Sequence, residues 1–209
     1  MALADVAAAV ENGKLKEIEA LVQAALDGGE KAEVILDCMI GAMGVIGDKF
    51  QRNEIFVPEM LVAALTMKKG VGVIQPALAA ADVPNLGTCI IGTVSGDLHD
   101  IGKNLVALMI ESAGFNVIDL GVDVPADKFI ETFKANPGTK IVACSALLTT
   151  TMDNMKNTVA ALIEAGVKET AKIMVGGAPI TQDFADAIGA DAWTPDAGAA
   201  AVKAKELAS

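Results

Sequence analysis

From Gly87 onward, short apolar runs rich in Val and Ile alternate with segments of helical character. The runs are TCIIGTV, FNVIDLG, KIVACSALL and KIMVGGA, and a helix-like stretch follows each of them. Strands that are apolar throughout are typical of a parallel sheet with helices on both faces, because crossover helices connect the strands. The pattern therefore predicts a doubly wound α/β domain in the C-terminal part of the chain.

The expected elements make up a five-stranded parallel sheet of the flavodoxin or Rossmann type. A short fifth strand, DAWTP, is expected at an edge, and Asp196 is placed to cap the helix that follows it. The helices are expected at Ile101–Ala113, Pro125–Ala135, Thr151–Ala165, Pro179–Ile188 and Ala197–Leu207. In such a sheet, ligands bind beyond the carboxyl ends of the strands, where the strand order reverses.

The N-terminal part of the chain shows helical periodicity instead. Four helices are expected: one before Gly13, then Leu15–Leu26, Glu30 to about Phe50, and Pro58 to about Val73, with Pro76 kinking or ending the last. Joined by short loops, they would pack as an antiparallel four-helix bundle. Because ADVPNLG, at Ala81–Gly87, has the composition of a linker, we expect a helical domain at residues 1–84 and an α/β domain at residues 85–209.

Composition excludes several classes of function. With a net charge of -11 and a pI near 4.5, the chain offers no basic surface for nucleic acid. It has no apolar run as long as a membrane span and no basic start of a secretory signal, so we expect a cytoplasmic protein that does not bind the membrane. Cys38, Cys89 and Cys144 lie far apart and outside any CxxC pair, which favours reduced core residues.

Residues Val94–Asn104, VSGDLHDIGKN, hold the only histidine of the chain, His99, two residues after Asp97. A lone histidine beside an aspartate is often a satisfied polar pair, and on its own it would not indicate a metal ligand. Two other unusual loops, however, follow the third and fourth expected strands: Ser145–Thr151, which contains three threonines, and Gly176–Ala178. All three loops are expected at the same end of the sheet, where a ligand would bind.

These three segments resemble the cobalamin-binding signature Asp-x-His-x-x-Gly, Ser-x-Leu, Gly-Gly of methionine synthase and the corrinoid methyl carriers. In this chain the signature reads Asp97-Leu98-His99-Asp100-Ile101-Gly102, Ser145-Ala146-Leu147 and Gly176-Gly177, at the intervals expected of the family. The resemblance covers both halves of the chain. Gly47–Gly70 is similar to the helical cap domain of methionine synthase, and Gly121–Phe129 is similar to the family's second βα loop.

By this resemblance, the chain binds cobalamin or a related corrinoid base-off and His-on, so that His99 replaces the cofactor's own base as lower axial ligand of cobalt. Imidazole suits a metal of this softness. Asp97 would accept the other ring N–H of His99 and so fix its tautomer. Thr151 would continue this hydrogen-bond relay at a position where methionine synthase has serine.

The resemblance implies further contacts to the cofactor. Gly102 would let the backbone approach the corrin, Val122 and Val124 would touch its rim, and Gly176 and Gly177 would line the tunnel for its tail. The remaining contacts are expected from Asp100 at the N-cap of its helix, from Ile101 and Leu147, from Ser145 and Thr149 on the benzimidazole, and from Phe56 in the cap. By themselves, the glycine pair would be an ordinary turn, the threonines a helix cap and Phe56 a bundle-core residue.

The implied function is that of a corrinoid protein that shuttles a methyl group on cobalt. Its expected partners are a substrate-specific methyltransferase, a second methyltransferase that delivers the methyl group to tetrahydrofolate or coenzyme M, and a reductive activase. The chain has no barrel and no zinc-ligand spacing to hold a methyl donor, so it is a carrier subunit and not a complete enzyme by itself. Methanol, methylamines, quaternary amines and aromatic methyl ethers all stay open as donors.

Three alternatives remain at this point. The cobalamin-binding subunit of an adenosylcobalamin-dependent mutase shares the three motifs but usually lacks a helical cap. A cobalamin-sensing module would need a DNA-binding domain, for which the acidic chain has no basic surface. A flavodoxin-like domain with another ligand would take up no cobalt.

Overall fold

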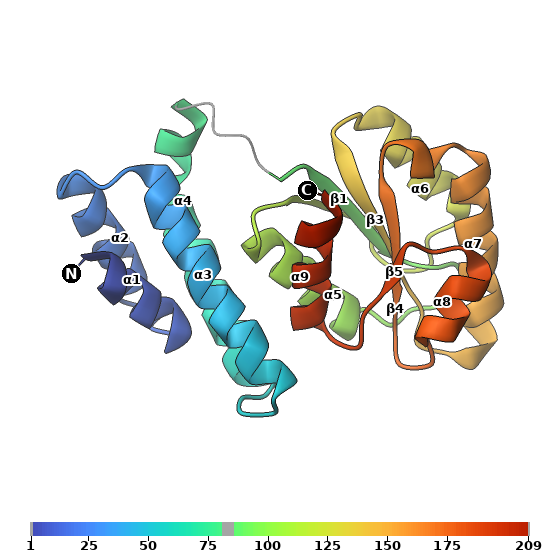
Figure 1. The fold of residues 1–209 in the computed structure, drawn as a ribbon, viewed down its shortest axis with the longest axis horizontal. Helices are drawn as coiled ribbons and strands as arrows, with labels where there is room; N and C mark the ends of the chain where they lie inside the picture. Colours follow the sequence, from blue (N-terminus) through green and yellow to red (C-terminus); the bar gives the residue numbers. More distant parts are fainter. Residues whose placement is uncertain (1, 81–85, 209) are drawn as a thin grey trace. The chain divides into compact units, whose positions relative to one another are not determined.

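The computed structural model describes residues 2–80 and 86–208. The chain divides into two compact units, Met1–Pro84 and Asn85–Ser209 (Figure 1). Most of the expected linker at Ala81–Gly87 lies outside the described residues. None of the helices in these ranges is both long and apolar enough to cross a membrane.

The first unit is built from the expected helices. Their bounds are α1 Ala2–Glu11, α2 Ile18–Asp27, α3 Ala32–Gln51 and α4 Val57–Ala80. Its core contains Val10, Ile18, Ile35, Met39 and Met60, all of them fully buried. The helical N-terminal region expected from the sequence is thus confirmed.

Helix α4 corrects one expectation, because it continues past Pro76 to Ala80. A proline in a helix removes one backbone hydrogen bond and crowds the preceding turn, but it does not have to end the helix. Ile74, two residues earlier, is fully buried in this unit. Its tertiary packing anchors the helix at this point, where local propensity alone would end it.

The second unit contains a parallel sheet in the order β2-β1-β3-β4-β5, which confirms the predicted doubly wound domain. The strands are β1 Thr88–Thr93, β2 Asn116–Asp119, β3 Thr139–Ser145, β4 Lys172–Gly176 and β5 Ala192–Trp193. As expected, β5 lies at an edge. The chain leaves β1 toward β2 on one side and then returns to β3 on the other, so the strand order reverses between β1 and β3.

Helices cover both faces of this sheet (Figure 1). They are α5 Ile101–Ser112, α6 Ala126–Ala135, α7 Met152–Glu164, α8 Gln182–Ile188 and α9 Ala197–Ala208, with short 3-10 turns η1 Thr149–Thr151 and η2 Val167–Glu169. In Figure 1, α5 and α9 lie on one face, and α6, α7 and α8 lie on the other.

Two helix starts depend on side-chain caps. Helix α8 begins three residues later than Pro179, because Thr181 is its N-cap and accepts the Phe184 N–H at 3.2 Å. Asp196 accepts the Ala199 N–H at 2.8 Å, which is the cap expected for the last helix.

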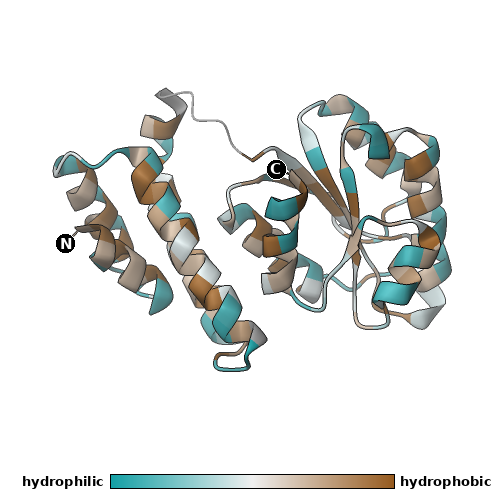
Figure 2. Cartoon of the chain, in the orientation of Figure 1, coloured by the Kyte–Doolittle hydropathy of each residue, from teal (hydrophilic) through white to brown (hydrophobic). Residues whose placement is uncertain are grey.

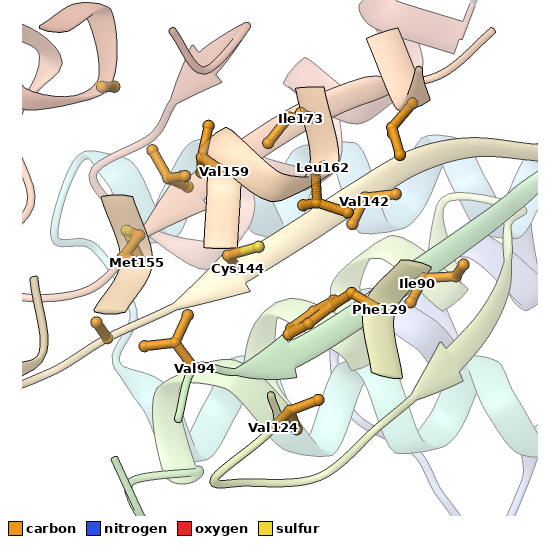
Figure 3. Packing of buried hydrophobic residues seen from close by; sticks show 14 of the residues in the cluster. Ile90, Val94, Val124, Phe129, Val142, Cys144, Met155, Val159, Leu162 and Ile173 are labelled. Atoms are coloured by element: carbon orange, nitrogen blue, oxygen red, sulfur yellow. The ribbon is translucent and has the colours of Figure 1, made fainter. Parts of the chain in front are cut away.

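The middle of the sheet is apolar, whereas the helices carry apolar and polar residues on different sides (Figure 2). One hydrophobic core lies between the strands β1 and β3 and the helices α6 and α7. It includes Ile90, Phe129, Val142 and Met155 (Figure 3). Gly92 leaves room for the Phe129 ring, since a Cβ there would lie 2.8 Å from the ring. This core fixes β1 and β3, and therefore the loops that follow them.

The cysteines are free, as expected. Cys89 and Cys144 are buried in β1 and β3, and burial raises the pKa of each thiol to about 12. Cys38 is half-buried, and its Sγ donates to the Leu3 carbonyl at 3.1 Å. Burial also raises the pKa of the Cys38 thiol. The raised pKa keeps each of these side chains in the thiol form at neutral pH.

Candidate functional site

The three loops singled out in the sequence meet at the carboxyl ends of adjacent strands. Thr93, the last residue of β1, pairs with Ser145 at the end of β3, and Ser145 pairs with Gly176 at the end of β4. The loop that carries Asp97 and His99 therefore lies beside the reversal of strand order. This is the position at which an open α/β sheet binds its ligand.

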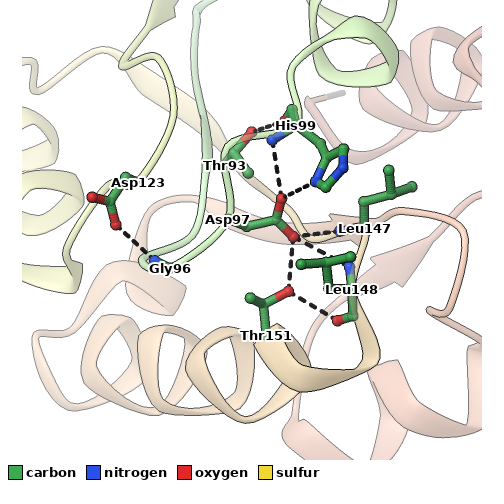
Figure 4. A network of polar contacts seen from close by, with 8 residues as sticks. All are labelled: Thr93, Gly96, Asp97, His99, Asp123, Leu147, Leu148 and Thr151. Carbon is green, nitrogen blue, oxygen red and sulfur yellow. Dashed lines mark hydrogen bonds and ion pairs between the residues drawn. The ribbon is translucent and has the colours of Figure 1, made fainter.

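Asp97 is the centre of a hydrogen-bond network in this region (Figure 4). Its side chain is fully buried. Oδ1 accepts the backbone N–H of His99 at 3.0 Å and contacts its ring Nδ1 at 2.7 Å. Oδ2 accepts the Leu147 N–H at 2.7 Å, the Leu148 N–H at 3.3 Å and the Thr151 hydroxyl at 2.8 Å. One carboxylate thus joins the β1–α5 loop to the β3–α7 loop.

These contacts decide the charge of Asp97. Burial by itself would raise the pKa of the carboxyl group. Hydrogen bonds from the Leu147 and His99 N–H groups, the Thr151 hydroxyl and the His99 ring outweigh burial and hold the pKa of Asp97 well below its ordinary value. Asp97 is therefore a buried anion at neutral pH.

An ionised carboxylate only accepts hydrogen bonds, so the His99 ring must carry a proton on Nδ1. In a neutral imidazole this leaves a lone pair on Nε2. That nitrogen faces away from Asp97 (Figure 4), and the His99 side chain is 48% exposed. Thr93 fixes the backbone of His99, since its hydroxyl donates to the His99 carbonyl at 2.9 Å. The arrangement fixes the orientation of the His99 ring and directs Nε2 away from Asp97, toward a possible ligand.

The metal-binding group in contact with His99 is the Asp97 carboxylate, whose oxygens already accept hydrogen bonds from the protein. Within residues 2–80 and 86–208, no three or more His, Cys, Asp or Glu side chains form a cluster that could hold a metal ion. A metal bound to His99 would therefore bring most of its ligands with it, as the metal of a macrocycle does.

The surroundings of His99 suit a large, flat and partly apolar group. The side chains near His99 in the sequence or in the neighbouring loop include three exposed apolar residues. Leu98, Ile101 and Leu147 are 72%, 82% and 41% exposed. A Cβ added at Gly102 or Gly176 would meet no atom within 4 Å. Exposed apolar side chains and open backbone at this end of the sheet are compatible with a binding surface.

Other expected site residues lie in varied places. Thr151 is buried against Asp97, so the structure brings together all three members of the expected relay. Ser145 and Val122 are half-buried, and Thr149 is exposed in η1. Phe56 belongs to the first unit, where its side chain is 64% exposed.

Three expected site residues also have structural roles in the fold. The Val124 side chain is 3% exposed and packs in the core, and Val124 pairs with Val94. Asp100 occupies the N-cap position of α5, but its side chain makes no cap hydrogen bond and accepts from the Asn104 side chain at 3.2 Å instead. A side chain at Gly177, with φ +131°, would overlap the carbonyl oxygen of Ala146, so the fold itself requires glycine at this position.

Several residues that organise the site were missed in the sequence. Asp123, in the β2–α6 loop, accepts the Gly96 N–H at 2.7 Å, and the Asn154 side chain donates to the Ser95 carbonyl at 2.8 Å. Lys103, in the first turn of α5, is buried and paired with Asp119. Only the position of Asp123 in a loop beyond a strand end could have drawn attention to it.

Fold and site together define a protein with B12-binding domains. A family described as B12 binding domain matches residues 87–203, and a second family with the same description matches residues 2–75. The chain is 40% identical to dimethylamine corrinoid protein 2 of Methanosarcina acetivorans over 206 residues, 98% of this chain and 95% of that protein. It is 45% identical to the trimethylamine corrinoid protein of Methanosarcina barkeri over 180 residues, 85% of this chain and 82% of that protein. The chain belongs to the corrinoid protein family.

Solved structures agree with this assignment. A cobalamin-binding protein from Desulfitobacterium hafniense matches with a TM-score of 0.84 and 28% identity, over 98% of both chains. A chain of the methanol:cobalamin methyltransferase complex MtaBC from Methanosarcina barkeri matches with a TM-score of 0.86 and 28% identity, over 99% of this chain and 79% of that chain. These matches indicate that the cofactor of this family is a corrinoid of the cobalamin type.

Proposed function

We propose that this protein is the methyl carrier of a multi-component methyltransferase system. It binds a corrinoid base-off, with His99 Nε2 as lower axial ligand of cobalt. The observation that carries the proposal is the oriented imidazole of His99, which is hydrogen-bonded through Nδ1 to the buried anion Asp97 and whose side chain is 48% exposed. A bound corrinoid supplies a cobalt centre that accepts and releases a methyl group.

The protein contributes binding, orientation and proton control to this chemistry. Asp97 keeps the proton of His99 on Nδ1, and Thr151 and Leu147 keep Asp97 ionised and fixed. With a corrinoid bound, a proton held by the His99–Asp97 pair would tune the cobalt, and the hydrogen bond to Asp97 would keep the His99 ring in place. The replacement Asp97→Asn should therefore change both the cobalt midpoint potential and its pH dependence. A variant in which both stay unchanged would contradict this role.

The open glycine backbone would accommodate the rest of the cofactor. Gly176 follows the apolar interior of β4, beside Ser145, and offers space in which the detached base could lie. Ser145 would hydrogen-bond that base, with Thr149 nearby, while Leu98, Ile101 and Leu147 would lie against the corrin. Phe56 would cover the opposite face of the corrin from the helical unit.

The partners follow from what the chain lacks. A substrate-specific methyltransferase would load the methyl group, and a second methyltransferase would transfer it to tetrahydrofolate or coenzyme M in the cytoplasm. A reductive activase would restore the cobalt after accidental oxidation. Since the relatives are named dimethylamine and trimethylamine corrinoid proteins, methylated amines are the favoured methyl donors.

The axial ligand can be tested by reconstitution with cobalamin. Because His99 is the only histidine, growth with ¹⁵N-labelled histidine labels this one ring. The reduced Co(II) form should show an electron paramagnetic resonance splitting from one axial nitrogen, and labelling should change its pattern. His99→Ala should lose the splitting and shift the absorption spectrum. A spectrum that neither labelling nor His99→Ala alters would contradict the ligand assignment.

The methyl-carrier role needs a separate test. The loaded and reduced protein should accept a methyl group from a methylated amine only when a cognate amine methyltransferase is present. The absorption change should follow the loss of amine with equal stoichiometry. Equal methyl transfer to wild type and to His99→Ala would mean that the protein binds the cofactor without taking part in methyl transfer through His99.

A further inference from the structure

We propose that Asp123 is a positioning residue for the His99 ligand. It lies in the β2–α6 loop and clamps the turn that carries Asp97. The inference rests on the proposed role of His99 as axial ligand, and it adds a residue that lies outside the cobalamin-binding signature. Figure 4 shows Asp123 approaching Gly96 from the side opposite Leu147 and Thr151.

Asp123 holds the main chain both before and after Asp97. Its Oδ1 accepts the Gly96 N–H at 2.7 Å and the Ser95 hydroxyl at 3.3 Å. Its own backbone N–H donates to the Asp97 carbonyl at 2.9 Å. One residue of a distant loop thus fixes the backbone on both sides of the Asp97 Cα.

The clamp acts on a tight turn that has a defined geometry. The Asp97 N–H donates back to the Val94 carbonyl at 3.1 Å, which closes a turn over Ser95 and Gly96. Next to this turn, Val94 and Val124 form a parallel bridge, and the Val124 N–H donates to the Thr93 carbonyl at 2.9 Å. The β2–α6 loop therefore extends the sheet just far enough to bring Asp123 against the turn.

Asp97 has two independent sets of contacts. The β3–α7 loop holds its carboxylate through Leu147 and Thr151. Asp123 holds its main chain. Both sets are needed to fix the position of the carboxylate that orients the His99 ring, because a side chain can be no better placed than the backbone that carries it.

The backbone of Asp123 supports a specific role. Its φ is +53°, in the left-handed region that Asp and Asn tolerate better than other residues with a side chain. Glycine would adopt this conformation without strain but would provide no acceptor for Gly96. Retention of a strained conformation is typical of a residue whose side chain is required at that place.

Three replacements separate the possible contributions. Asp123→Asn keeps a side-chain oxygen and the left-handed conformation and removes only the charge. Asp123→Gly relaxes the backbone but removes the acceptor, and Asp123→Ala removes the acceptor while keeping the strain. Asp127→Ala is the matched control, because it removes an exposed carboxylate from the start of the next helix, α6.

Each full-length protein is loaded with cobalamin, and three quantities are measured. These are the cobalamin dissociation constant, the fraction of Co(II) that shows axial nitrogen coupling, and the thermal midpoint of the cofactor-free protein. Asp123→Asn and the control should stay within about twofold of wild type in affinity. Asp123→Gly and Asp123→Ala should bind about tenfold more weakly and show a smaller fraction of coupled cobalt.

The outcomes are distinguishable. An Asp123→Gly protein that matches wild type in affinity and nitrogen coupling would overturn the inference. It would also be overturned if Asp123→Gly lowered only the thermal midpoint, since that is a structural role, or if Asp123→Asn behaved like Asp123→Gly, since charge would then be the cause. Absence of nitrogen coupling in the wild type would instead contradict the proposed function itself.

Discussion

At the level of single residues, the site depends on how Asp97 keeps its charge in a fully buried position. A buried carboxylate is unfavourable unless hydrogen-bond donors surround it. Here the donors come from backbone N–H groups, a hydroxyl and the His99 ring, which together also define where the ring must lie. The same contacts therefore stabilise the fold and prepare the ligand.

Asp97→Asn should destabilise the cofactor-free protein by about 3 kcal/mol at pH 7, because the amide group would point N–H donors at other donors. The pKa of Asp97 is lowered by folding, so its contribution to stability is present above the unfolded pKa of about 3.9 and declines as the pH falls below that value. Urea unfolding of both proteins between pH 3 and 7 measures the difference. The difference in unfolding free energy should become smaller as the pH falls. A difference that stays constant with pH would show that the charge of Asp97 plays no part.

Gly176 and Gly177 should respond differently to replacement by alanine. Gly177→Ala should cost more than about 2 kcal/mol in the cofactor-free protein, because its φ of +131° is unsuited to a side chain and the Cβ would overlap Ala146. Gly176→Ala should leave that stability unchanged, since its Cβ would meet nothing, but it should weaken cobalamin binding about tenfold or more. Unfolding curves and cobalamin titrations test the pair, and equal binding by Gly176→Ala and wild type would mean that the cofactor does not occupy this space.

At this scale, sequence reasoning found the residues that share a local motif and missed those brought together by folding. Asp97 and His99 are two residues apart, and Thr151 was found through the family resemblance. Asp123 contacts Gly96 through a hydrogen bond between separate loops, which no spacing reveals. Val124 was expected at the corrin rim through the resemblance alone, and the sequence did not reveal that its side chain also packs in the core of the domain.

At the level of elements, the first turn of α5 is fixed to the end of β2 by Lys103 and Asp119. The Lys103 side chain is 1% exposed, and its Nζ lies 2.6 Å from Asp119 Oδ1. Asp119, 38% exposed, also accepts the Gly121 N–H at 2.8 Å. A lysine near a helix N-terminus is unfavourable for the helix dipole, so its presence indicates that this tertiary contact matters more.

The unequal burial of this pair predicts unequal costs. Asp119→Ala should destabilise the protein by about 3 kcal/mol, since it leaves a buried ammonium without its carboxylate. Lys103→Met should cost only about 1 kcal/mol, because the exposed Asp119 can be hydrated and the methionine keeps the packing of the stem. The double variant should be more stable than Asp119→Ala alone. Denaturant unfolding of this double-mutant cycle provides the test, and purely additive costs would exclude coupling.

The elements themselves were largely predictable, because apolar runs and helical stripes are local signals. The strands of the sheet fall within the runs recognised in the sequence, apart from one residue at the start of β3, and β5 lies at the expected edge. Several helix limits differ from the expected ones, and two of them have a clear physical reason: packing around Ile74 carries α4 past Pro76, and the cap at Thr181 delays α8. Both reasons depend on contacts that local propensity does not contain.

At the level of the whole molecule, the chain consists of two units, each with its own buried core. The first unit also exposes large apolar side chains at the start of α4: Phe56, Val57 and Leu61 are 64%, 44% and 40% exposed. A reactive metal face must be shielded from water and oxidants, and these residues come from the unit that matches a B12 binding family of its own. We therefore expect the helical unit to protect the cofactor and the α/β unit to bind it.

This division of labour predicts the behaviour of separated parts. Residues 85–209 contain the complete sheet, its helices and every contact of Asp97 described above, so the fragment should fold and bind cobalamin with His99 coordinated, within about tenfold of the full-length affinity. Its reduced cofactor, however, should be oxidised by oxygen or water much faster than in the full-length protein.

The decay of the reduced absorption band, followed by stopped flow, gives both rates. Phe56→Ala in the full-length protein is the matched variant. Its oxidation rate should lie between those of the fragment and the full-length protein, and the spectrum that reports His99 coordination should be unchanged. If fragment and full-length protein were oxidised at equal rates, the helical unit would not be a shield, and its exposed apolar residues would have to serve the partner methyltransferases instead.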